Sequence, residues 1–81
     1  MKHLIEIFVE KNCRECEDVL LVVSALSDLD KWTIAVYRRE NDVAIFRARN
    51  VVISPATFIG GTLMFYGSFT RDALISKLGL N

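Results

Sequence analysis

The fold of this chain is most constrained by the junction between an apolar, strand-like run and a long segment suited to a helix. Residues 3–9 are rich in β-branched and aromatic side chains, and the polar residues 11–12 break the run. Residues 17–29 contain neither Gly nor Pro and are numerous enough for a helix. Between the two segments lie Cys13 and Cys16, the only cysteines of the chain. The junction therefore predicts a strand that leads through a dithiol loop into a helix.

The spacing of the two cysteines is typical of redox and metal sites. Cys13 is expected near a helix N-terminus, where unpaired backbone N–H groups and the helix dipole can lower a thiol pKa from ~8.5 toward ~3.5–7.5. Cys16 follows one turn later and faces the same side of the helix. Two thiols so placed can close a small disulfide or bind one soft metal ion.

Length and charge limit the classes of protein to which the chain can belong. Its 81 residues predict one small domain over 1–81. Lys plus Arg and Asp plus Glu number 10 each, so net charge gives no drive toward nucleic acid or an anionic membrane surface. Residues 51–70 carry no charged side chain, but Pro55 and Gly60-Gly61 divide them. Two short strands therefore fit this stretch better than a transmembrane helix.

The N-terminal residues indicate the cellular compartment in which the protein is expected. Glu6 and Glu10 interrupt the first apolar stretch and no small-residue cleavage site follows it, so we expect a cytoplasmic protein. Structural disulfides do not persist in a reducing cytosol, where a lone CxxC is more often catalytic or metal-binding.

Apolar periodicity and turn residues predict seven elements in the order βαβαββα. Strands are expected at 3–10, 32–39, 56–60 and 62–66, and helices at 14–29, 42–49 and 70–78. Residues 32–37 alternate and are apolar enough for a central strand. Gly60-Gly61 indicates a tight hairpin, because paired glycines accept positive φ angles. The predicted fold class is α/β, a four-stranded mixed sheet flanked by helices, with the CxxC at the carboxyl end of the first strand.

Local signals also mark the ends of the later helices. Asn41 or Asp42 is expected to cap the helix at 42–49, and Asn50 suits a left-handed residue after its end. Thr70 precedes the last helix, which is expected to end before Gly79. Three apolar side chains of the short helix are predicted to face the core: Val43, Ile45 and Phe46. Two basic side chains are predicted to lie in solvent: Arg47 and Arg49.

Two motifs together resemble those of a known superfamily. Cys13-Arg14-Glu15-Cys16 follows the first strand, and Ile53-Ser54-Pro55-Ala56-Thr57-Phe58-Ile59-Gly60-Gly61 comes about forty residues later. This arrangement resembles the thioredoxin superfamily over nearly the whole chain. The chain looks most like the small glutaredoxin-like and single-domain thioredoxin-like members, so the resemblance implies a thioredoxin-like fold.

The resemblance implies roles for four residues. Cys13 maps onto the solvent-exposed nucleophile and Cys16 onto the more buried resolving cysteine. Pro55 maps onto a proline that follows a cis peptide bond beside the disulfide, so we predict a cis bond between Ser54 and Pro55. Such a bond turns the preceding backbone groups outward, where they can pair with an extended thiol substrate. Ser54 and Pro55 are therefore the expected substrate-binding residues.

The chain departs from the family pattern between and beyond the cysteines. The inner dipeptide Arg14-Glu15 holds neither the proline nor the aromatic residue of the best-known members. Arg14 favours a thiolate, whereas Glu15 and the acidic residues after Cys16 oppose it. Glutathione-binding glutaredoxins carry a double glycine and an acidic residue after the last strand, but Gly67 stands alone before Ser68.

Some thioredoxins use a buried acidic residue below the disulfide as a proton acceptor. Glu6 lies in the first strand and is a candidate for this role. We interpret it instead as a partly solvated strand residue.

The favoured function is that of a thiol-disulfide oxidoreductase. In this scheme the Cys13 thiolate attacks a substrate disulfide, and Cys16 then resolves the mixed disulfide. Dithiol chemistry needs no cofactor and no metal. The expected partners are a protein disulfide or a glutathione-like thiol, and a reductase or thiol that recycles the enzyme. We expect a monomer or a weak homodimer.

Two alternatives belong to other functional classes. A small soft-metal module is the first, because copper-chaperone-like domains also carry a CxxC after their first strand. Their order is βαββαβ with a terminal strand, however, and a Met that this chain lacks precedes their CxxC. The second is a thioredoxin-fold module used for partner binding.

Overall fold

The structure, a computed structural model, describes residues 3–26 and 32–79. Its elements occur in the predicted order: β1 (His3–Val9), α1 (Arg14–Ser24), β2 (Trp32–Arg38), α2 (Val43–Ala48), β3 (Ala56–Ile59), β4 (Thr62–Tyr66) and α3 (Arg71–Leu78). The sheet order is β2-β1-β3-β4, with β1 parallel to β2 and the other two pairs antiparallel. The mixed four-stranded sheet confirms the predicted fold class. None of the helices in the described part of the chain is long and apolar enough to cross a membrane.

Two of the predicted elements differ from the structure. β2 lies at the edge of the sheet and not at its centre, because β3 pairs with the opposite side of β1. The first helix ends at Ser24 rather than at residue 29. Leu26 is buried and its N–H donates to Val23 O, so the chain leaves the helix axis to place this side chain in the core. Residues 27–29 of the predicted helix lie outside the described residues.

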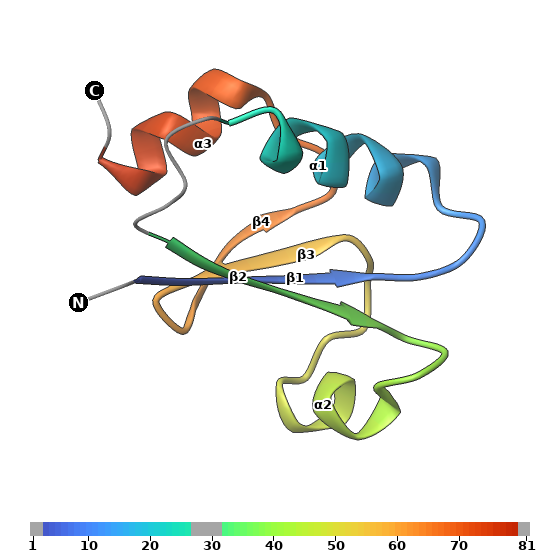
Figure 1. Ribbon diagram of the computed structural model, residues 1–81. Helices are drawn as coiled ribbons and strands as arrows, with labels where there is room; N and C mark the ends of the chain where they lie inside the picture. Colours follow the sequence, from blue (N-terminus) through green and yellow to red (C-terminus); the bar gives the residue numbers. More distant parts are fainter. Residues whose placement is uncertain (1–2, 27–31, 80–81) are drawn as a thin grey trace.

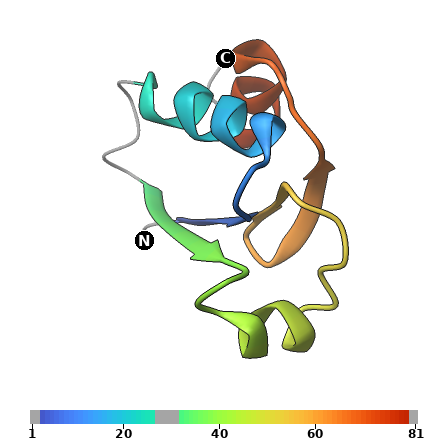
Figure 2. The same cartoon turned by 90° about the vertical axis from the view of Figure 1, so that its right-hand side faces the viewer.

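The three helices cover the two faces of the sheet unequally. In Figure 1, α1 and α3 lie together on one side of the sheet, and the short α2 lies on the other. Figure 2 shows the same three layers after a quarter turn, with the sheet between the two groups of helices. Alternation along β1 sends its side chains to both layers. Ile5, Ile7 and Val9 pack with α1 and α3, whereas Phe8 packs with Phe46 of α2.

The α2 face of the sheet holds an ion pair between a buried Glu6 and a partly exposed Arg49. Glu6 is only 4% exposed, and both of its carboxylate oxygens accept hydrogen bonds from Arg49, one at 2.8 Å from Nη1. The Tyr37 hydroxyl donates to the same carboxylate at 3.4 Å, and the Arg49 guanidinium stacks over Phe58. The hydrogen bond to Glu6 raises the pKa of Arg49, which keeps the guanidinium charged. The predictions that Glu6 is partly solvated and that Arg49 lies in solvent are therefore wrong.

The short helix α2 follows its predicted pattern only in part. Phe46 is buried, Ile45 is partly buried against the same cluster and Arg47 is exposed, as predicted, but Val43 is 44% exposed. Asp42 occupies the N-cap position without capping the helix. Its carboxylate accepts instead from the backbone N–H of Arg38.

The predicted turns and caps follow local chemistry closely. Asn50 has φ 57°, and Gly60 and Gly61 of the β3–β4 hairpin have φ 59° and 84°. Thr70 caps α3 through a hydrogen bond from Ala73 N–H, and Gly79 ends the helix with φ 72°. These predictions are confirmed.

Breaking the Glu6–Arg49 pair should destabilise the fold. We expect Arg49→Met to lower the free energy of unfolding by roughly 3 kcal/mol, because it leaves the buried Glu6 carboxylate without its cation. The exposed Arg47→Met change on the same helix is the matched control and should stay within about 0.5 kcal/mol of wild type. Urea unfolding at neutral pH measures both. An Arg49→Met protein as stable as the control would show that the pair contributes nothing.

Tyr37 should report on the same pair through its titration. Burial, and then the negative charge of Glu6, raise the pKa of Tyr37 above its ordinary value of 10.0. The stability linked to the neutral phenol is therefore present below pH 10 and is lost as the pH rises through the folded-state pKa. In a Tyr66→Phe protein, which keeps Tyr37 as its single tyrosine, tyrosinate absorbance at alkaline pH should give this raised midpoint. Adding Glu6→Gln should lower the midpoint of the Tyr37 titration. An unchanged midpoint would exclude the charge of Glu6 as a cause of the raised pKa.

Candidate functional site: the Cys13–Cys16 disulfide and the Ser54–Pro55 segment

The site forms where the parallel strands β1 and β2 end. Because they are parallel, their carboxyl ends lie at one edge of the sheet, and the loop after β1 leads directly to Cys13. Asn12 adopts a left-handed conformation with φ 54°, which Asn tolerates better than most residues. The chain then enters α1 with Cys13 at the N-cap.

Cys13 and Cys16 form a disulfide with their Cα atoms 5.2 Å apart. The Cys13 Sγ also accepts a hydrogen bond from the backbone N–H of Cys16 at 3.1 Å, so it occupies the place of a helix-capping oxygen. Cys16 is 2% exposed and belongs to the core cluster under α1, whereas Cys13 is only half-buried. Cys13 is therefore the sulfur that an incoming molecule can reach.

The Ser54–Pro55 segment is joined to the loop after β4, which itself approaches the first turn of α1. The Ser54–Pro55 peptide bond is cis, the isomer that the sequence predicts. The Pro55 carbonyl accepts a hydrogen bond from Gly67 N–H at 2.8 Å. Gly67 has φ 78°, and a Cβ on it would lie 3.2 Å from the carboxylate of Glu15, the residue that precedes Cys16. The first turn of α1, the loop after β4 and the start of β3 thus meet at one place.

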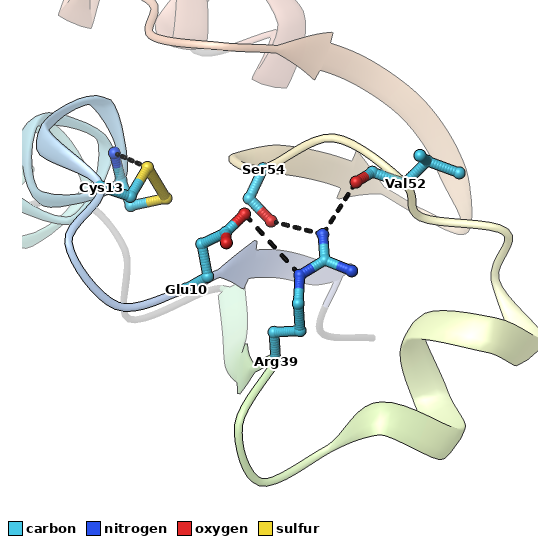
Figure 3. The surroundings of a disulfide bond; sticks show 6 residues. Glu10, Cys13, Arg39, Val52 and Ser54 are labelled. Atoms are coloured by element: carbon cyan, nitrogen blue, oxygen red, sulfur yellow. Dashed lines mark hydrogen bonds and ion pairs between the residues drawn. A yellow bond between two sulfur atoms is a disulfide. The ribbon is translucent and has the colours of Figure 1, made fainter.

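A residue that the sequence analysis missed lies in the same surroundings. Figure 3 shows the Arg39 side chain beside Glu10 and Ser54, near the disulfide. Its Nε lies 3.7 Å from Glu10 Oε1, and its Nη2 donates to Val52 O at 2.9 Å and to Ser54 Oγ at 3.2 Å. Arg39 directly follows β2, so the expectation of two parallel strands with adjacent carboxyl ends was the one signal that could have found it.

Comparison with known proteins identifies the family. A thioredoxin domain model matches residues 3–79, almost the whole chain. The chain belongs to the thioredoxin domain family. A search of the curated proteins finds no match.

Solved structures of thioredoxins share the fold of this family member. The thioredoxin of Malassezia sympodialis (Mala s 13) superposes with a TM-score of 0.77 at 15% identity, over 98% of this chain and 74% of the other. The thioredoxin of Fasciola hepatica gives a TM-score of 0.78 at 15% identity, over 98% and 80% of the two chains. Family membership and the Cys13–Cys16 disulfide together support a thiol-disulfide redox role.

The sheet behind the disulfide of this thioredoxin domain carries apolar side chains and one buried hydroxyl, that of Thr57, which pairs with Ile7 in the register of β1 and β3. Ile7 and Val9 share the core cluster with Cys16, while Glu6 points to the opposite face and pairs with Arg49. Among the described residues, the other buried polar side chain is Thr57, whose hydroxyl finds no hydrogen-bond partner. Glu6 therefore cannot accept a proton from Cys16, because the alternation of β1 places the sheet between them.

The copper-chaperone alternative does not fit the fold. In the order βαββαβ the second and third strands follow one another directly, whereas here α2 separates β2 from β3. The family match points to the same conclusion.

The unequal burial of the two sulfurs predicts unequal reactivity. After mild reduction, iodoacetamide should modify Cys13 at least about tenfold faster than Cys16, since only an accessible thiolate reacts readily. Partial alkylation followed by peptide mass spectrometry measures both rates. In denaturant the two rates should approach each other, which serves as the control. Preferential modification of Cys16 in the folded protein would contradict the geometry described above.

Proposed function

We propose that this thioredoxin-domain protein is a thiol-disulfide oxidoreductase in which Cys13 is the nucleophile and Cys16 the resolving cysteine. The observation that carries the proposal is the placement of a half-buried Cys13 at the N-cap of α1, bonded to a fully buried Cys16. One sulfur is accessible to a substrate, and the other is held within reach of the first.

The reaction proceeds by two thiol-disulfide exchanges. The Cys13 thiolate attacks one sulfur of a substrate disulfide, the substrate S–S bond breaks, and the other substrate sulfur leaves as a thiolate. Cys16, once deprotonated, attacks the Cys13 sulfur of the mixed disulfide and releases the second substrate thiolate. The substrate gains two electrons, and the protein is left with the Cys13–Cys16 disulfide that the structure contains.

The start of α1 favours the thiolate form of Cys13. The Cys16 N–H that donates to Cys13 Sγ would donate more strongly to a negatively charged sulfur. The positive end of the helix dipole acts in the same direction. Glu15 and Glu17 in the first turn act against it, so the thiolate depends mainly on the backbone N–H groups.

In the proposed reaction, the buried Glu6 carboxylate is not the acceptor of the Cys16 proton. Since Glu6 lies on the far face of the sheet, we propose that the proton of Cys16 leaves to water that enters the site. Cys16 packs with the apolar side chains of Ile7 and Val9, and burial of this kind disfavours a charged thiolate.

Ser54 and Pro55 are the proposed substrate-binding residues. Ser54 is half-buried and lies in the surroundings of the disulfide that Figure 3 draws, while Pro55 is buried and its carbonyl accepts from Gly67 N–H. The backbone just before Pro55 can pair with an extended substrate segment, as an added strand does at a sheet edge. The substrate is a protein disulfide or a glutathione-like thiol, and a reductase or thiol in the cytoplasm recycles the dithiol.

Two cysteine variants test the proposal. Cys13→Ser should abolish disulfide exchange, whereas Cys16→Ser should accumulate a mixed disulfide between Cys13 and the substrate, because no thiol remains to resolve it. Ser24→Ala, a change at the exposed end of α1, is the control and should exchange like wild type. Non-reducing mass spectrometry after incubation with a protein disulfide distinguishes the three outcomes.

The wild-type dithiol should also titrate reversibly against defined thiol-disulfide buffers. A two-electron midpoint within roughly −120 to −270 mV, the range of known dithiol enzymes, is the expected result. Full activity in either cysteine variant, or no intramolecular disulfide across that range, would refute the scheme.

A further inference from the structure

We propose that Arg39 is a positioning residue that fixes the segment before Pro55 and thereby presents Val52 and Ile53 to protein substrates. This inference rests on the proposed oxidoreductase function. It concerns how the protein selects a disulfide and not how the two cysteines exchange it.

Both the backbone and the guanidinium of Arg39 contact other parts of the fold. Its backbone N–H donates to Val9 O at 2.9 Å and extends the pairing of β2 with β1 by one residue. Its guanidinium stacks over the Phe46 ring of α2 at 4.6 Å from the centroid. The ion pair with Glu10 adds a third restraint on the Nε side. The guanidinium is therefore fixed relative to the sheet before it contacts the loop.

The Nη2 group of Arg39 joins two points of one loop. It donates to the carbonyl of Val52 and to the hydroxyl of Ser54, so it spans the peptide units on both sides of Ile53. Figure 3 shows the two dashed contacts converging on the same nitrogen. The loop lies outside any helix or strand, and Arg39 gives one of its backbone carbonyls, that of Val52, a hydrogen-bond donor. The planar guanidinium makes these contacts and the one to Glu10 together, which a lysine ammonium at the same place could not do with the same geometry.

The loop so fixed carries two strongly exposed apolar side chains. Val52 is 80% exposed and Ile53 is 61% exposed, although both have short, branched side chains that usually lie inside. With the Val52 carbonyl turned toward Arg39, neither side chain reaches the core cluster of Phe46 and Val51 behind the loop. Arg39 therefore keeps apolar surface in water beside the proposed substrate-binding residues Ser54 and Pro55.

This surface fits an extended protein segment with apolar side chains next to its disulfide. Backbone pairing at Ser54 would align such a segment, and burial of Val52 and Ile53 against it would add affinity. A small disulfide reacts at Cys13 without covering these two side chains. Arg39 should therefore affect protein disulfides more than small ones.

The test compares two substrates with three variants. Pre-reduced wild type, Arg39→Met, Arg39→Lys and Arg38→Gln are each oxidised by insulin and by hydroxyethyl disulfide, and the second-order rate constants are measured. Arg39→Met should lose at least about fivefold more rate with insulin than with the small disulfide, as the loss of about one net hydrogen bond would give. Arg39→Lys should fall between Arg39→Met and wild type.

Arg38→Gln is the matched control. Arg38 is the neighbouring residue, and its exposed side chain makes no hydrogen bond or ion pair with the rest of the described chain. This variant should react like wild type with both substrates. A loss with insulin equal to that of Arg39→Met would assign the effect to positive charge in general and overturn the proposal.

A second readout is independent of activity. ¹⁵N relaxation of the Val52, Ile53 and Ser54 amides should show order parameters that fall from about 0.85 toward 0.6 in Arg39→Met and stay unchanged in Arg38→Gln. If wild type reacts with neither disulfide, the proposed function fails, while the order parameters still test the positioning role. Unchanged order parameters overturn the inference. Lowered order parameters with an unchanged insulin rate overturn the link between loop position and substrate choice.

Discussion

Parallel pairing of β1 with β2 is the interaction on which the candidate site depends. It brings the carboxyl ends of two strands to one edge of the sheet, although a helix separates them in the sequence. The chain leaving β1 supplies Cys13, and the chain leaving β2 supplies Arg39. The crossover α1 must then return over the sheet, which places Cys16 in the core beneath it. An antiparallel β2 would have put Arg39 at the far end of the sheet.

The alternation of β1 divides the protein into two chemical environments. On one face Ile5, Ile7 and Val9 pack under the disulfide helix and provide an apolar floor. On the other face Glu6 pairs with Arg49 among aromatic rings, and Phe8 lies 5.0 Å from Phe46. The acid is thus used for stability and not for proton transfer, since a one-residue shift in the register of β1 would be needed to bring it to Cys16. The charges near the two sulfurs are instead those of Glu15 and Glu17 in the first turn of α1 and the positive end of the helix dipole.

The site combines a buried sulfur with an unusually exposed loop. In the proposed mechanism, burial of Cys16 limits exchange to molecules that first react at Cys13. The loop before Pro55, in contrast to Cys16, is exposed, and it presents apolar side chains where a substrate would lie in the proposed mechanism. Such exposure persists only if the backbone is held from outside the loop, and the contacts of Arg39 supply that restraint. The proposed roles in reactivity and in substrate selection therefore fall on different residues at the same edge.

The features predicted correctly from sequence are those that depend on neighbouring residues. Asn50, the Gly60-Gly61 hairpin and the Thr70 cap follow from what each residue permits its own backbone to do, and the structure contains all three. The element order follows in the same way from apolar periodicity within short windows. The dithiol at the start of a helix is also local, because a single turn joins Cys13 to Cys16.

What the tertiary structure alone decided involves residues far apart in the chain. The edge position of β2 depends on where β3 pairs, and the ion pair of Arg49 depends on Glu6, 43 residues earlier. Arg39 resembles any charged residue at a strand end until Ser54, 15 residues later, comes beside it. By itself the sequence determined the elements, their turns and the reactive pair. The tertiary structure decided which charged side chains are buried and which loop they bond to. The strength of an ion pair or hydrogen bond depends on the burial and distance of its partners, and a local sequence pattern does not reveal either.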